Sequence, residues 1–134
     1  MTLSGRSLRD LHWSQREKKV ARATFDAAVA RECVAIRKKV EEMLRSTDEP
    51  EQIWHVHQFL SEKQNEIGRK YDFRYSVLIG VFGRLLFEGW ITESDLTELN
   101  EEKRAAITSI ADMHRESDAQ PTVPADGLAS RARR

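Results

Sequence analysis

The 134-residue sequence contains one cysteine, three prolines and no long hydrophobic run. Cys33 alone cannot form an internal disulfide and has no second thiol to complete a zinc site, so the fold must be stabilised by packing. No apolar stretch approaches the ~20 residues of a transmembrane helix, and the N-terminus lacks the apolar core of a signal peptide, which together predict a cytoplasmic protein. The prolines stand at positions 50, 121 and 124, and they leave two long uninterrupted stretches that suit helices.

Net charge is also absent, because 22 basic residues balance 22 acidic ones. This balance disfavours a simple polyanion-binding protein. The two signs are nevertheless separated along the chain: residues 1–46 hold 11 Lys or Arg and 6 Asp or Glu, whereas residues 90–116 hold 3 and 7. Such a chain can attract a second copy of itself, the basic part of one against the acidic part of the other.

Hydrophobic periodicity predicts an all-α fold with a long N-terminal helix. A capping box of Ser14 and Glu17 marks its start, and apolar residues at steps of three and four continue from Phe25 to Met43. A helix that ends at about Arg45 spans ~48 Å, whereas a compact chain of this length has a radius of gyration of ~14 Å. An apolar stripe on such an overhanging helix would be exposed in a monomer, which predicts a homodimer.

A second helix and a central helix are expected next. Asp48 predicts the cap of the second helix, Gly68 predicts its end, and its apolar face comprises Ile53, Val56, Phe59, Leu60 and Ile67. Residues 75–87 are apolar nearly all round, and their length favours a buried helix that is capped by Asp72 and closed by Gly89. Within it, Gly80 and Gly83 predict close backbone approach, and Arg84 with Glu88 predicts an i,i+4 pair.

The C-terminal part predicts a short turn and a last helix. Residues 92–95 form a capping pattern for the turn, and Asn100 caps the helix, whose inward residues are Ile107, Ile110 and Ala111. The periodicity is lost from about residue 118. We therefore expect a single all-α domain over residues 13–116, between an N-terminal extension of residues 1–12 and a frayed or disordered tail of residues 117–134.

No group of residues predicts catalysis, a cofactor or a metal site. His55 and His57 lie two positions apart on a helix and point to nearly opposite sides, so they cannot share one ion. Cys33 falls on the apolar stripe of the first helix, where we expect it to pack as a small hydrophobic residue. Because no nucleophile, base and orienting group converge in a motif, we expect a protein that is not an enzyme.

A mixed polar and aromatic stripe runs opposite the apolar face of the second helix. It comprises Trp54, His57, Gln58, Ser61 and Gln64. Two interpretations remain open. Either Trp54 belongs to the core and the other four to ordinary surface, or the five residues form a partner-binding patch, since large aromatic side chains are enriched at interface anchors.

Between Trp13 and Ala111 the sequence resembles the fluorescence recovery protein family of cyanobacteria. The resemblance is densest over residues 13–15, 54–61 and 70–72, and it continues to Gly89. It implies an all-α homodimer with a long first helix and no enzymatic activity. It also implies that the protein binds the photoactivated orange carotenoid protein, speeds its return to the resting orange form, and so ends photoprotective quenching at the phycobilisome.

The sequence departs from the family pattern at the mixed stripe of the second helix. The family's functional tryptophan, histidine, aspartate and arginine fall on Trp54, His57, Gln58 and Gln64, so two neutral amides replace a charged pair. Because complementary charges mainly set partner choice and encounter rate, this departure implies a retained scaffold with altered recognition chemistry.

Two functions follow. The first is a regulator of the fluorescence recovery type, with the orange carotenoid protein or a homologue as its partner. The second is a dimeric protein-interaction module with a different partner in a non-photosynthetic bacterium. The basic first helix and the Arg-rich residues 131–134 suggest a third, nucleic-acid-binding dimer, which the overall charge balance disfavours.

Overall fold

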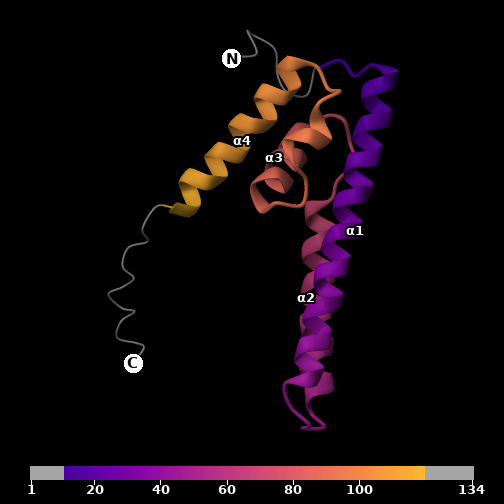
Figure 1. Ribbon diagram of the computed structural model, residues 1–134, viewed down its shortest axis with the longest axis vertical. Coiled ribbons are helices and arrows are strands. Elements are labelled where there is room, and N and C mark those ends of the chain that lie inside the picture. The colour runs from indigo at the N-terminus through magenta and orange to yellow at the C-terminus, as the bar shows by residue number, and fades with distance from the viewer. Residues whose placement is uncertain (1–10, 120–134) are drawn as a thin grey trace.

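The computed structural model describes residues 11–119, and this part of the chain contains helices and no strands (Figure 1). The predicted all-α fold is therefore confirmed. In chain order the elements are α1 (Gln15–Arg45), α2 (Gln52–Lys70), α3 (Leu78–Glu88), the short 3-10 helix η2 (Glu93–Leu96) and α4 (Glu101–Ala119).

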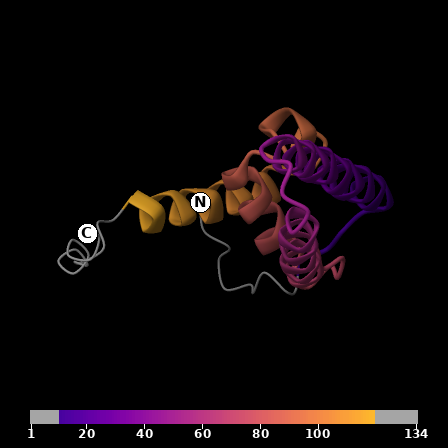
Figure 2. The same cartoon turned by 90° about the horizontal axis from the view of Figure 1, so that it is seen from below.

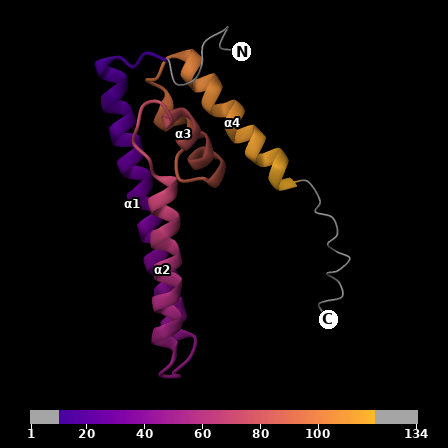
Figure 3. The same cartoon turned by 180° about the vertical axis from the view of Figure 1, so that it is seen from behind.

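The helices are arranged as a long hairpin with a small bundle at one end. α1 and α2 run antiparallel, α3 lies beside the N-terminal half of α1, and α4 packs on α3 (Figures 1 and 3). Seen from below, α4 points away from the hairpin (Figure 2). We call residues 33–69 the arm, and residues 11–32 with 70–119 the head. Val56 is the only buried residue of the arm, so the hydrophobic core lies in the head.

The long first helix begins and ends where its sequence predicts. The hydroxyl of Ser14 accepts from the amide of Glu17 at 3.1 Å, and the carboxylate of Glu17 accepts from the amide of Ser14 at 3.1 Å. Both donors would otherwise be orphaned at the helix start, so the capping box fixes the first turn. α1 continues for 31 residues to Arg45.

Both predicted ends of α2 are wrong. The helix begins at Gln52 without a side-chain cap, rather than at a cap formed by Asp48. The side-chain amide of Gln52 instead donates to the carbonyl of Met43 at 2.7 Å and closes the hairpin turn. At the other end α2 passes through Gly68 to Lys70, because the buried ammonium of Lys70 is held by carboxylates of the head.

The central helix α3 is shorter than predicted at its start and ends where expected. It begins at Leu78 without a side-chain cap, because Asp72 pairs with Arg74 at 2.6 Å instead. Its end is confirmed at Gly89, which has φ +90°, the left-handed conformation that glycine adopts without strain. Most of its apolar side chains are fully buried: Leu78, Ile79, Phe82 and Leu85.

α3 and α4 pack closely at one of the two predicted glycines. A Cβ atom added to Gly83 would lie 2.6 Å from Cβ of Ile110, so only glycine admits this contact. Gly80 has nothing within 4 Å of such an atom, and the prediction of close approach there is wrong. The predicted cap of α4 is confirmed, since Asn100 Oδ1 accepts from the amide of Lys103 at 2.9 Å.

The boundaries of the folded part differ from the expected domain limits at both ends. Leu11, in the expected N-terminal extension, is 7% exposed and joins the core. α4 continues to Ala119, so residues 117–119 of the expected tail are helical. The rest of that tail lies outside the described residues. None of the helices between residues 11 and 119 has the length and apolarity needed to cross a membrane.

Candidate functional site

All five residues of the mixed stripe lie on α2, within the arm, and all five are exposed. At 3.6 residues per turn they cover ~120° of the helix circumference, so they share one face. Trp54 is 66% exposed, which excludes the interpretation that it belongs to the core of this chain. A large aromatic side chain without cover is the feature expected of an interface anchor.

Three residues of the stripe line a groove, and the other two lie outside it. His57, Ser61 and Gln64 line a groove of about 470 Å³ between α1 and α2, together with Cys33 and four other residues. Trp54 and Gln58 lie outside this lining, and the amide of Gln58 donates to Glu62 at 3.3 Å. Cys33 is exposed at the groove wall rather than packed as predicted.

The apolar face of α2 is covered only in part by the other described residues. Val56 alone is buried, while Ile53 is 55% exposed and Leu60 41% exposed. On α1, Val34 and Leu44 are about as exposed. Within the described residues, the arm therefore leaves these four large apolar side chains exposed.

Neither histidine of α2 belongs to a cluster of potential metal ligands within the described residues. His55 Nδ1 lies 2.9 Å from Oε1 of Gln52, on the first turn of α2. Between residues 11 and 119 no three potential His, Cys, Asp or Glu ligands lie together.

Sequence reasoning missed a buried ionic cluster in the head, at the boundary with the arm. Lys70 Nζ donates to Glu32 at 2.9 Å and to Glu88 at 2.7 Å. Tyr71 Oη donates to Glu32 at 2.8 Å, and Arg84 Nε donates to Glu88 at 2.8 Å. The predicted Arg84–Glu88 pair is confirmed. The other pairs could not be seen in the sequence, because their partners lie 18 to 39 positions apart.

This cluster sets the ionisation of its members. Burial raises the pKa of the Glu88 carboxyl, but the hydrogen bonds and charges of Lys70 and Arg84 outweigh burial and hold that pKa below its usual value. Burial, reinforced by the neighbouring Glu32 carboxylate, raises the pKa of the Tyr71 hydroxyl well above its usual value. The Glu88 carboxyl is thus charged and the Tyr71 phenol neutral at physiological pH.

A second ionic anchor ties the first turn of α1 to the start of α4. Lys103, which is 1% exposed, donates to Glu17 at 3.1 Å and to the carbonyl of His12. Glu17 also accepts from the backbone amide of Asn100 at 2.8 Å. Burial raises the pKa of Glu17, but these donors together lower it below its usual value. Both anchors therefore lie in the head.

Comparisons with known proteins agree with this architecture. The family model of the photoprotection regulator fluorescence recovery protein matches residues 13–111. The fluorescence recovery protein of Synechocystis sp. PCC 6803 is 38% identical over 99 residues, which is 74% of this chain and 91% of that protein.

Solved structures give the same result. The fluorescence recovery protein of Fremyella diplosiphon superposes with a TM-score of 0.69 at 40% identity, and that of Synechocystis sp. PCC 6803 with a TM-score of 0.70 at 38% identity. Each comparison covers 75% of this chain and 99% of the other. Helix α4 continues beyond the family match to Ala119.

Proposed function

Because this chain belongs to the fluorescence recovery protein family, a family of photoprotection regulators, we propose that it binds the photoactivated form of an orange carotenoid protein and accelerates its return to the resting form. The observation that carries the proposal is the match over residues 13–111, which includes the whole mixed stripe. The mechanism is differential affinity. A protein that binds one conformer of its partner better than the other shifts the equilibrium, whereas equal affinity shifts nothing.

We further propose that the working form is a homodimer joined through the arm. The support is the exposed apolar set on α1 and α2, comprising Val34, Leu44, Ile53 and Leu60. Soluble monomers rarely expose apolar side chains so densely on one hairpin, and a twofold-related copy would cover them.

Trp54 is the proposed anchor for the partner, framed by His57, Gln58, Ser61 and Gln64. Its exposure of 66% leaves about two thirds of the residue surface available for burial. Anchor residues of this kind contribute ~2 kcal/mol or more, so Trp54→Ala should weaken binding at least ~30-fold.

The test is dark recovery of a photoactivated orange carotenoid protein, followed by its absorbance at increasing concentrations of this protein. We expect the wild type to accelerate recovery and Trp54→Ala to need a higher concentration for the same rate. Met113→Ala is the matched control, because Met113 is 63% exposed at the far end of α4. Absence of any acceleration at saturating wild-type protein would remove this partner.

The neutral amides at Gln58 and Gln64 favour a second candidate, a dimeric interaction module with a different protein partner. A Gln58→Asp/Gln64→Arg variant discriminates the two, because it supplies the charges of the resembled family. If the amides serve another partner, only the charged variant will act on the carotenoid protein. A pull-down from the source organism that recovers an orange carotenoid protein homologue with the wild-type chain would dismiss this second candidate.

A further inference from the structure

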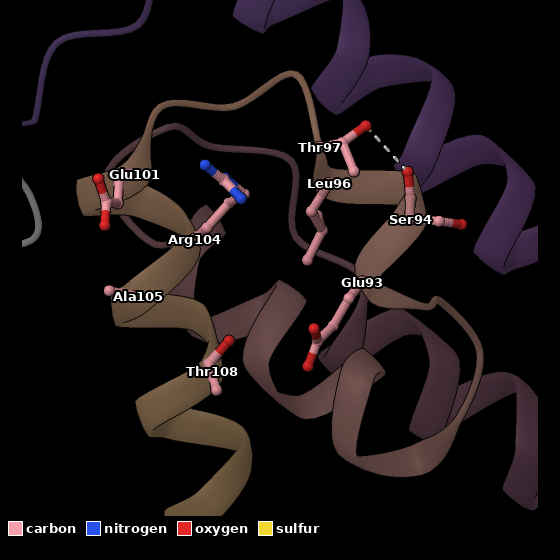
Figure 4. Close-up of a pocket in the computed structure, with 8 residues that line it drawn as sticks. All are labelled: Glu93, Ser94, Leu96, Thr97, Glu101, Arg104, Ala105 and Thr108. Carbon is pink, nitrogen blue, oxygen red and sulfur yellow. Dashed lines mark hydrogen bonds between the residues drawn. The ribbon is translucent and has the colours of Figure 1, made fainter.

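A groove on the head lies between η2 and the first half of α4, away from the arm (Figure 4). Its volume is about 630 Å³. Leu96 and Ala105 supply apolar surface, and Glu93 and Glu101 approach it from opposite elements (Figure 4). No part of the proposed function uses this groove.

The two carboxylates of the groove are not engaged by the described part of the chain. Glu93 and Glu101 are exposed and form no ion pair or side-chain hydrogen bond with other residues between 11 and 119. The neighbouring acids differ, since Asp95 pairs with Arg31 at 3.1 Å and Glu98 with Arg16 at 2.7 Å. The groove thus holds two negative charges that can pair with a cation from elsewhere.

The cation within the groove does not neutralise them. Arg104 Nε donates to the carbonyl of Leu99 at 3.1 Å, which directs the guanidinium toward the loop before α4 (Figure 4). Because Arg104 is held by the backbone, a ligand that brings further guanidinium groups still meets unpaired carboxylates at Glu93 and Glu101. The chemistry of the groove therefore fits a short segment that combines arginines with one aliphatic side chain.

Such a segment follows α4 in this chain. Residues 128–134 contain three arginines, at 131, 133 and 134, and one leucine, at 128, without any acidic residue. Residues 90–116, which include the groove, contain 7 acidic and 3 basic residues. The segment is therefore complementary in charge to the surface that the groove opens on.

The segment can reach the groove of its own chain. Thr108 lines the groove and stands 11 positions before the end of α4 at Ala119, a distance of ~17 Å along the helix. Residues 120–131 span up to ~40 Å when extended, more than twice that distance. Tethering also gives the segment a high effective concentration at the groove, which compensates for the weakness of each exposed ion pair.

We propose that residues 128–134 dock in the head groove of the same chain, with arginines against Glu93 and Glu101 and with Leu128 near Leu96. The contact is weak and electrostatic, so it should be lost as the salt concentration rises.

The test uses the full chain with a nitroxide label at Ser130→Cys in a Cys33→Ser background. Nuclear magnetic resonance then compares amide signals with the label oxidised and reduced. We expect the oxidised label to weaken the signals of Ala105 and Thr108 selectively. This weakening should disappear in Glu93→Gln/Glu101→Gln and in the variant with all three tail arginines changed to glutamine.

A matched control removes two charges from the far end of α4, through Glu116→Gln/Asp118→Asn, and should keep the effect. Signals that are not weakened, or that are weakened equally in both groove and tail variants, would overturn the proposal. A mixed sample tests whether the docked segment comes from a second copy. It combines chains that carry the nitroxide but no isotope with chains that carry the isotope but no nitroxide. Selective weakening in that mixture would assign the groove to another chain's tail and also overturn docking within one chain.

Discussion

At the scale of single residues, the most consequential side chain is the buried cation Lys70. Its side chain is 2% exposed and pairs with Glu32 and Glu88, whose side chains are 6% and 23% exposed. Lys70→Met leaves two largely buried carboxylates without their shared partner, which typically costs on the order of 3 kcal/mol. We expect urea denaturation to show this loss as a lower midpoint. Lys63→Met is the control, because its pair with Glu66 is exposed and should cost less than ~1 kcal/mol.

Two carboxylates of the ionic anchors, those of Glu17 and Glu88, predict how stability depends on pH. Glu17 and Glu88 have folded-state pKa values below their usual value, so the unfolded state binds more protons in acid. Their contribution is fully present above the ordinary glutamate pKa of ~4.3 and is lost as pH falls through the lowered folded-state values. The free energy of unfolding, measured by urea denaturation from neutral to acid pH, should decline less for Glu17→Gln/Glu88→Gln than for the wild type. The exposed Glu116→Gln should decline like wild type, and equal slopes for all three proteins would refute the assignment.

At the scale of helices, the packing of α3 on α4 predicts opposite changes in stability for alanine substitutions at Gly83 and Gly80. Gly83→Ala places a methyl group against Ile110 and should cost ~1–3 kcal/mol through overpacking. Gly80→Ala has open space and lies inside a helix, so it should stabilise the protein by ~0.5–1 kcal/mol. Thermal denaturation monitored by circular dichroism measures both. Two substitutions that shift the midpoint in the same direction would contradict this packing of α3 on α4.

The helices show which features a sequence determines locally. Caps between residues three positions apart, at Ser14 and Asn100, were predictable because both partners lie within one turn. Helix ends that depend on tertiary contacts were not. Gly68 does not end α2, since Lys70 is drawn into the head, and Asp72 does not cap α3, since it pairs with a nearby arginine.

The position of the mixed stripe on α2 was predictable from the sequence, and its surroundings were not. The periodicity placed Trp54 and its neighbours on one face of α2, and the structure keeps them on that face. The same periodicity placed Ile53 and Leu60 on the apolar face of α2 without indicating what covers that face. An apolar stripe has the same spacing whether it packs on its own chain or on a second copy, so only the length of α1 indicated the difference.

At the scale of the whole molecule, the head is self-sufficient and the arm is not. Of the buried apolar residues between 11 and 119, the head contains all except Val56. It also contains both ionic anchors. The arm, in contrast, leaves Leu60 41% exposed in the middle of α2. If two arms pair, Leu60→Glu buries an unpaired carboxylate at the interface, at a cost of several kcal/mol. The dimer dissociation constant should therefore rise by about 100-fold or more. Sedimentation equilibrium at micromolar concentrations measures this change.

The control must separate dimerisation from loss of folding. Met113→Glu introduces the same charge at a residue that is 63% exposed on α4, outside the arm, and should leave the dissociation constant unchanged. Both variants should keep the helical circular dichroism of the wild type, because neither position belongs to the buried core. A wild type that sediments as a monomer would refute pairing through the arm. Equal weakening by Leu60→Glu and Met113→Glu would instead place the contact between the two copies outside the arm.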